Sequence, residues 1–187
     1  MSSLGNREKQ LLLALARRAL IWAVRNRESL NDLPNDETLQ RPGGAFVTLQ
    51  LRGRLRGCVG QLASKDTLAE VVAHCSKSAA LEDPRFEEVS TAELPGIEIE
   101  LSVLSEPVDV KLEQIQPGKH GLIVSSGGKR GVLLPQVAEM FHWNARQLLE
   151  ETCVKADLAP DAWKDPATRV QAFTAEVFSE ADFPATK

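Results

Sequence analysis

The stretch Ile97-Glu-Ile-Glu-Leu-Ser-Val-Leu104 carries the strongest strand signal in this 187-residue chain. Its apolar residues alternate with Glu98, Glu100 and Ser102, which is the period-two pattern of a strand that buries one face. Such alternation is typical of an antiparallel sheet that is covered on one side only. The sequence therefore predicts a strand over 97–104 whose polar face carries two carboxylates and a hydroxyl.

Helical and strand patterns continue on both sides of this strand. Apolar residues at helical spacing, a capping box and two hairpin patterns define the other elements. In chain order we expect a helix over 7–25, strands over 45–51 and 55–59 with a turn at Gly53-Arg54, a helix from Thr67 to Asp83, the strand over 97–104, a hairpin over 122–134, a short helix from Pro135, a helix over 144–156 and a strand over 170–178. Hairpins dominate this order, so we expect an α+β fold with a mostly antiparallel sheet and flanking helices.

Length and composition are those of an ordinary globular protein, with 43% apolar and 26% charged residues. The length fits a single domain over 1–187, with a possible smaller lobe within about 55–118. A net charge of −4 argues against bulk binding to nucleic acid, which needs clustered positive charge. The apolar run Leu11–Val24 contains Arg17 and Arg18, so no membrane association is expected.

Three cysteines, no Cys-x-x-Cys pair and no signal-peptide pattern predict free thiols in the cytoplasm. Cys58 is the first candidate for chemistry, because Gly57 and Gly60 bracket it. Glycine allows unusual backbone angles or the close approach of a ligand. Arg56 lies two residues before it, and cationic neighbours lower the pKa of a thiol. This combination suits a nucleophilic cysteine, and the open alternative is a small buried residue at a strand end.

A nucleophilic thiol normally needs a base. His120 is the best of the three histidines, since it lies in the glycine-framed loop Gly118-Lys-His-Gly121. Glu98 and Glu100 point the same way on their strand, so either could carry a proton or they could form salt bridges with arginines. Ser102 shares that face and is a candidate ligand-binding residue. A plain surface histidine is the alternative for His120.

The turn Asp83-Pro-Arg-Phe86 supplies a further candidate. Arg85 could bind an anionic ligand group. The same turn could equally be a structural corner, because aspartate and proline are typical turn residues. Cysteine and histidine show no metal-ligand spacing, so no metal site is expected and any cofactor is unknown.

The segment Leu55-Arg-Gly-Cys-Val-Gly60 resembles the signature of the AMMECR family, also called AmmeMemoRadiSam system protein A. Further segments resemble the family in the same order, and they are Asp83–Phe86, 97–104, Gly118–Gly121, Leu133–Val137 and Trp163–Phe178. The resemblance covers about residues 11–178 and implies an α+β fold with an antiparallel sheet and two unequal lobes in one compact domain. The family name implies a genomic association with Memo-like and radical SAM proteins, which are the expected partners. It implies no established reaction.

Two functional hypotheses follow. In the first, the protein is a thiol-dependent enzyme or a cofactor-handling protein. Cys58 is then the nucleophile or ligand, His120 or Glu100 carries the proton, and Arg56 or Arg85 orients an anion. In the second, the protein is a non-catalytic interaction module, and its glycine-framed segment is a recognition edge for the Memo-like or radical SAM partner. Composition and pattern leave the oligomeric state open.

Overall fold

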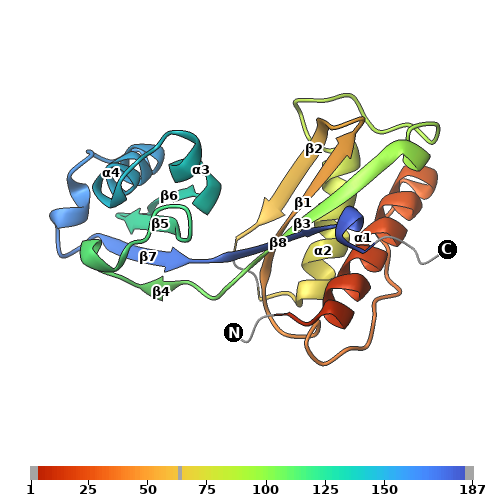
Figure 1. Ribbon diagram of the computed structural model, residues 1–187, viewed down its shortest axis with the longest axis horizontal. Coiled ribbons are helices and arrows are strands. Elements are labelled where there is room, and N and C mark those ends of the chain that lie inside the picture. The colour runs from red at the N-terminus through yellow and green to blue at the C-terminus, as the bar shows by residue number, and fades with distance from the viewer. Residues whose placement is uncertain (1–3, 63–64, 184–187) are drawn as a thin grey trace. The chain divides into compact units, whose positions relative to one another are not determined.

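The computed structural model describes residues 4–62 and 65–183. The chain divides into two compact units, one formed by Met1–Leu104 with Glu176–Lys187 and the other by Ser105–Ala175. Each unit contains a four-stranded antiparallel sheet with helices (Figure 1). The predicted α+β fold is confirmed. No helix in the described ranges is long and apolar enough to cross a membrane.

The first unit is a sheet with two helices on one face. Its strand order is β2-β1-β3-β8, and the bounds are β1 Gly44–Leu51, β2 Arg54–Gln61, β3 Ile97–Leu104 and β8 Ala175–Ser179. The helices are α1 Asn6–Asn26 and α2 Leu68–Leu81, with short 3-10 helices η1 Leu94–Gly96 and η4 Glu180–Asp182. Strand β3 has the predicted bounds. Its residues Ile97, Ile99 and Leu101 are buried in the core that α1 and α2 also line.

Alternation along the strands separates this sheet into two faces. Val47 and Leu49 of β1 join Ile99 in the core beneath the helices. Thr48 and Glu100 are half-buried and point to the other side, because side chains alternate along a strand. We call the side turned away from α1 and α2 the polar face.

The hairpin between β1 and β2 departs from the expected turn. It turns at Arg52 and Gly53, both with positive φ (53° and 71°), one residue earlier than the sequence indicated. Leu49 pairs with Gly57, but the next residue of β1 pairs with Leu55. Arg56 is therefore the extra residue of a β-bulge, which changes the direction of its side chain relative to a regular strand.

Helix α2 begins and ends where the sequence predicted. Thr67 Oγ1 accepts a hydrogen bond from Glu70 N at 3.2 Å, and the Glu70 carboxylate accepts one from Thr67 N at 2.7 Å. This capping box satisfies two backbone donors at the helix start. The helix ends just before Asp83-Pro84, because the residue before proline is excluded from the helical conformation.

The second unit has the strand order β4-β7-β5-β6. Its elements are β4 Val108–Asp109, η2 Leu112–Gln114, β5 Gly121–Ser126, β6 Lys129–Leu133, α3 Pro135–Met140, α4 Ala145–Lys155, η3 Ala162–Lys164 and β7 Arg169–Phe173. The predicted β5–β6 hairpin is confirmed and turns at Gly127 and Gly128, both with positive φ. Leu148 and Leu149 of α4 pack on this sheet in a separate core.

One expectation, for the last strand, needs correction. The predicted strand over 170–178 is two strands, because β7 belongs to the second sheet and β8 to the first, with Thr174 between them. The apolar pattern shifts phase at Ala172-Phe173, just before the break, but local periodicity does not show which strand each segment pairs with. The smaller unit is Ser105–Ala175, whereas the sequence suggested a smaller lobe within about 55–118. Most of that range packs in the first unit, since β2 and α2 contact β1.

Candidate functional site

Cys58 lies in the edge strand β2 and points onto the polar face. It is directly opposite Thr48 of β1, and Thr48 is directly opposite Glu100 of β3. Directly opposite residues of antiparallel strands project to the same side, so these three side chains form one row. The Thr48 hydroxyl donates a hydrogen bond to Cys58 Sγ at 3.4 Å.

An ion pair holds the backbone of Cys58 from the outer side of β2. Cys58 N donates to Asp83 Oδ2 at 2.9 Å, and Arg85 Nη2 donates to Cys58 O at 3.0 Å. Arg85 also donates through Nε to Asp83 Oδ1 at 2.9 Å and through Nη2 to Asp83 Oδ2 at 2.7 Å. We call this pair the clamp. It occupies both backbone polar groups that an edge strand leaves unpaired at this residue.

The clamp places charge beside the Cys58 thiol. The hydrogen bond from Arg85 holds the pKa of Asp83 far below its ordinary value. The pKa of Arg85 is raised, chiefly by its hydrogen bond to Asp83, and its interaction with the Cys58 thiol acts in the same direction. The other two thiols are buried, and burial raises the pKa of Cys75 to about 11 and also raises that of Cys153.

Arg56 has partners other than the thiol. Its Nε and Nη2 donate to the two carboxylate oxygens of Glu93 at 2.7 and 3.2 Å. Nη1 and Nη2 donate to the carbonyl oxygens of Glu87 and Glu88 at 2.7 and 3.1 Å. The Arg56 guanidinium lowers the pKa of Glu93 to about 2. The cation beside the thiol is therefore Arg85, and a ligand-binding role for Arg56 stays a prediction.

The two glycines that frame Cys58 have packing reasons. A Cβ at Gly57 would collide with the backbone carbonyl of Ala79 in α2. A Cβ at Gly60 would collide with the ring of Phe46, its cross-strand neighbour. The first glycine lets α2 approach the sheet, and the second lets an aromatic ring lie over the strand. Neither arrangement tests the prediction that these glycines also admit a ligand.

The remaining predicted residues fall into two groups. Glu100 shares the sheet with Cys58, but two strand spacings, about 10 Å, separate their Cα atoms. Ser102 lies two residues further along β3, opposite Phe46, and is buried. His120 belongs to the second unit. The structure thus brings Cys58, Glu100 and Ser102 onto one sheet, and Arg85 to its edge.

His120 is held by its own loop. Its Nδ1 accepts a hydrogen bond from Gln116 N at 3.2 Å, which places the proton of the neutral ring on Nε2. Burial lowers the pKa of His120, and the charge of Lys119 acts in the same direction. The ring is therefore neutral at physiological pH, as a general base must be.

Sequence reasoning did not identify Thr48 and Asp83 as parts of the site. Thr48 looked like any polar residue of an alternating strand, and only the register shows that it faces Cys58. Asp83 was interpreted only as a residue of a structural corner. Its hydrogen bond from Cys58 N spans 25 residues of chain and has no local signal.

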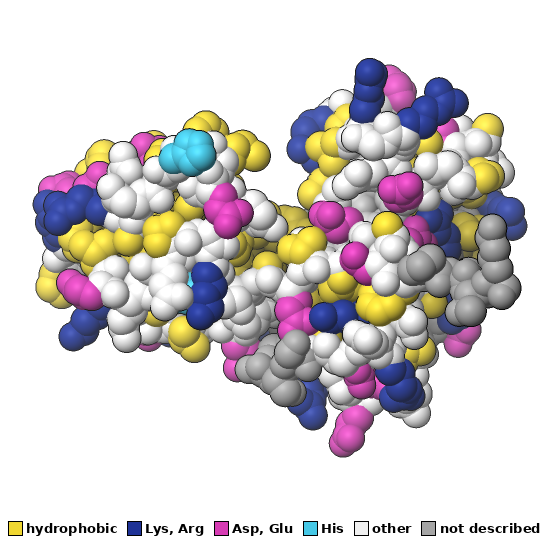
Figure 2. Space-filling view, in the orientation of Figure 1, with side chains coloured by type: hydrophobic (Ala, Val, Ile, Leu, Met, Phe, Trp, Pro, Cys, Tyr) yellow, Lys and Arg dark blue, Asp and Glu magenta, His cyan; other side chains and the backbone are white. Residues whose placement is uncertain are grey.

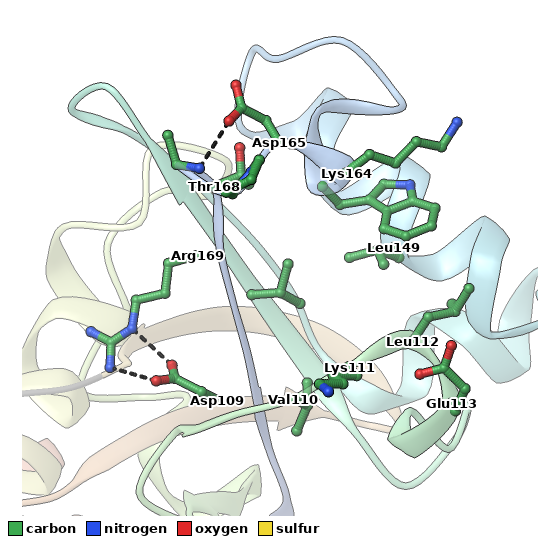
Figure 3. Close-up of a pocket in the computed structure, with 14 residues that line it drawn as sticks. Asp109, Val110, Lys111, Leu112, Glu113, Leu149, Lys164, Asp165, Thr168 and Arg169 are labelled. Atoms are coloured by element: carbon green, nitrogen blue, oxygen red, sulfur yellow. Dashed lines mark hydrogen bonds and ion pairs between the residues drawn. The ribbon is translucent and has the colours of Figure 1, made fainter.

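The second unit contains a cavity of about 620 Å³ (Figure 3). Leu149, Trp163 and Val170 contribute apolar walls, and the Asp109–Arg169 ion pair lies at one side. Trp163 Nε1 is buried and has no hydrogen-bond partner among the residues that the structure describes. The predicted site residues do not line this cavity.

Charges of both signs are interspersed over the face shown in Figure 2. In the site region, Arg56 pairs with Glu93 and Arg85 pairs with Asp83, each at 2.7 Å. Within residues 4–62 and 65–183, no group of three or more His, Cys, Asp or Glu side chains is placed to hold a metal ion.

Known proteins resemble this chain over nearly its whole length. The AMMECR1 family matches residues 13–178. A protein of Methanothermobacter thermautotrophicus is 40% identical over 186 residues, covering 95% of this chain and 96% of that protein. A protein of Thermococcus gammatolerans is 40% identical over 185 residues, covering 91% and 89%. The crystal structure of an uncharacterised protein from Pyrococcus horikoshii matches with a TM-score of 0.82 and 34% identity, over 94% of this chain and 93% of that one. The chain therefore belongs to the AMMECR1 family.

Proposed function

We propose that this protein is a thiol-dependent enzyme or cofactor-handling protein whose reactive atom is Cys58 Sγ. One observation supports this most directly: the sulfur accepts a hydrogen bond from the Thr48 hydroxyl and interacts with the Arg85 guanidinium, on a peptide held at both polar atoms. Hydrogen-bond donors and cations stabilise negative charge on sulfur, and the thiolate is the nucleophile and the ligand form of cysteine. A peptide fixed in this way also keeps the sulfur in one position.

The other residues take roles that their positions allow. The side chain of Arg85 is 55% exposed, and its Nη1 donates to no oxygen atom in the described part of the chain. It would orient an anionic group of the ligand. Glu100 is too far from the sulfur for direct proton transfer, so it would act through the ligand or through water. His120 is the other candidate for the proton carrier, as predicted from the sequence.

Thiol reactivity tests this proposal. The native protein is treated with iodoacetamide at pH 7.5, and labelling of each cysteine is followed by mass spectrometry. We expect Cys58 to react severalfold faster than the thiol of free glutathione, although it is half-buried. Partial burial alone would make Cys58 react more slowly than glutathione, because the reagent reaches the sulfur less easily. Reaction slower than glutathione would therefore contradict the proposal, even if Cys75 and Cys153 react more slowly still.

A protein-interaction role is the second candidate, and a specific surface supports it. Met140 is 72% and Phe141 57% exposed at the end of α3, and Phe141 stacks on Trp143 with ring centroids 4.9 Å apart. Exposed apolar side chains of this kind are common in protein interfaces. The expected partners are the Memo-like and radical SAM proteins that the family name implies.

Capture of a purified partner tests this second role. The Memo-like protein of the same genome is passed over immobilised wild-type protein, Phe141→Ser and Cys58→Ala. We expect Phe141→Ser to weaken capture and Cys58→Ala to leave it intact. Equal capture by all three would show that this surface does not bind the partner. Loss of capture by Cys58→Ala alone would place the contact at the thiol site instead.

A further inference from the structure

We infer that Asp83 is a positioning residue that fixes the Arg85 guanidinium beside Cys58, so that the group recognised there is an anionic part of the ligand. The inference rests on the proposed thiol function and names a ligand class and a residue for it. Asp83 does not touch the sulfur in any hydrogen bond. It acts through Arg85 and through the Cys58 peptide.

Four N–H donors converge on the Asp83 carboxylate. They are Cys58 N at 2.9 Å, Arg85 N at 3.2 Å, Arg85 Nε at 2.9 Å and Arg85 Nη2 at 2.7 Å. An ionised carboxylate has about four lone-pair sites, so its capacity is filled. Only 3% of the Asp83 side chain is exposed, compared with 55% for Arg85. The carboxylate is thus a buried anchor, and the guanidinium is the accessible end.

The anchor determines where the free N–H groups of Arg85 point. A guanidinium is planar and has five N–H donors in a rigid arrangement. Nε and Nη2 are engaged by Asp83, and the second proton of Nη2 goes to Cys58 O. The two N–H groups of Nη1 donate to no oxygen atom within the described residues. Their direction is fixed by bonds to Asp83 and Cys58, which is the preorganisation that anion recognition needs.

Other charged groups near Cys58 do not duplicate this arrangement. Glu100 lies across β1 and would repel an anion, which makes a positioned guanidinium more necessary. Arg56 is committed to Glu93. Thr48 is neutral, and Cys75 lies in α2 and is buried. Arg85 is therefore the cation that can meet an anionic group beside the sulfur.

Two alkylating reagents that differ in charge test the inference. With iodoacetate or iodoacetamide, the Cys58 thiolate forms a bond to the CH₂ carbon, the carbon–iodine bond breaks and iodide leaves. The readout is the rate with iodoacetate divided by the rate with iodoacetamide, relative to the same ratio for glutathione. We expect the relative ratio at Cys58 to exceed one. In Arg85→Gln it should fall on the order of fivefold, since one charge contact is lost.

Asp83→Asn separates positioning from simple electrostatics. Removing a negative charge should by itself raise the preference for the anionic reagent. Asn has a single carbonyl oxygen, so it cannot accept all four donors, and Arg85 loses its anchor. Positioning therefore predicts that the ratio falls to the level of Arg85→Gln, and that the double variant falls no further. Arg54→Gln is the matched control, because it removes an exposed positive charge from the same strand, and its ratio should equal the wild-type ratio.

A ratio in Asp83→Asn that equals or exceeds the wild-type ratio would overturn the inference. A wild-type ratio no higher than that of glutathione would also overturn it. If Cys58 in that case still reacts rapidly with iodoacetamide, the result does not contradict the proposed thiol function. Slow reaction with both reagents would instead contradict the thiol function itself. Continued protection of Cys75 shows that each variant is folded. If Asp83→Asn unfolds, Arg85→Lys takes its place in the test, because lysine keeps the charge but lacks the planar guanidinium. The ratio of iodoacetate to iodoacetamide rates should fall in this variant as well.

Discussion

Replacing Arg56 with Gln should weaken the first unit in a manner that depends on pH. Its guanidinium donates two hydrogen bonds to the Glu93 carboxylate and two to backbone carbonyls of the segment before it. Only 15% of the Arg56 side chain and 25% of the Glu93 side chain are exposed. Glutamine keeps much of the apolar stem but cannot supply the fork or the charge. The change therefore removes one ion pair without emptying the core.

The magnitude follows from the pKa of Glu93. Arg56 and, to a smaller extent, Ser90 lower this pKa from 4.5 to about 2. If the whole shift were due to Arg56, it would correspond to about 3 kcal/mol of unfolding free energy. The bonds from Ser90 remain in the variant, and partial solvent exposure weakens the pair. We therefore expect Arg56→Gln to lower the free energy of unfolding by about 1–2 kcal/mol at pH 7.

The sign of the pH dependence is determined by the direction of the shift. The pKa of Glu93 is lower in the folded state than in the unfolded state. Its contribution to stability is therefore complete above about pH 4.5 and is lost as the pH falls toward about 2. The wild-type protein loses this contribution on acidification, and the variant has little of it to lose. The difference in unfolding free energy should be widest at neutral pH and should narrow below about pH 4.5.

Urea unfolding measured by tryptophan fluorescence provides the assay. Trp143→Phe and Trp163→Phe leave Trp22 of α1 as the reporter of the first unit. Arg54→Gln is the control, and as an exposed surface change it should stay within about 0.5 kcal/mol of the parent. Equal stability of Arg56→Gln and its parent at pH 7 would refute the reasoning. So would a difference that persists unchanged to pH 2.5.

Three further measurements follow from the site. Gly57→Ala should lower the unfolding free energy by about 1–3 kcal/mol in the same assay, because its Cβ meets the carbonyl of Ala79; an unchanged stability would show that α2 can move away freely. Thr48→Val should slow iodoacetamide labelling of Cys58 at pH 7.5 while the protection of Cys75 is retained, since the hydroxyl donor to sulfur is lost. Cys75 itself, with a pKa of about 11 from burial, should be labelled at pH 8 only as urea unfolds the protein; labelling in the native state would contradict its burial.

Regular elements could be predicted from local patterns because their causes are local. The alternation over 97–104 gave the bounds of β3, and the capping box at Thr67 gave the start of α2. Glycines at 127 and 128 indicated the β5–β6 turn, which requires positive φ at both positions. The prediction of a single strand over 170–178 failed because its cause is not local. The exchange of partner sheets at Thr174 depends on pairings with distant strands, which the local sequence does not specify.

The candidate site shows the same division between features with local causes and features that depend on distant contacts. The sequence by itself indicated the candidate side chains, namely a glycine-framed thiol at Cys58 and a turn arginine at Arg85, because residue type sets charge, donors and nucleophilicity. Only the tertiary structure decided which arginine belongs to the thiol. A bulge turns Arg56 toward Glu93, and the turn after α2 brings Asp83 and Arg85 to the edge of β2. Register and edge contacts join residues far apart in the chain, so no local pattern could specify them.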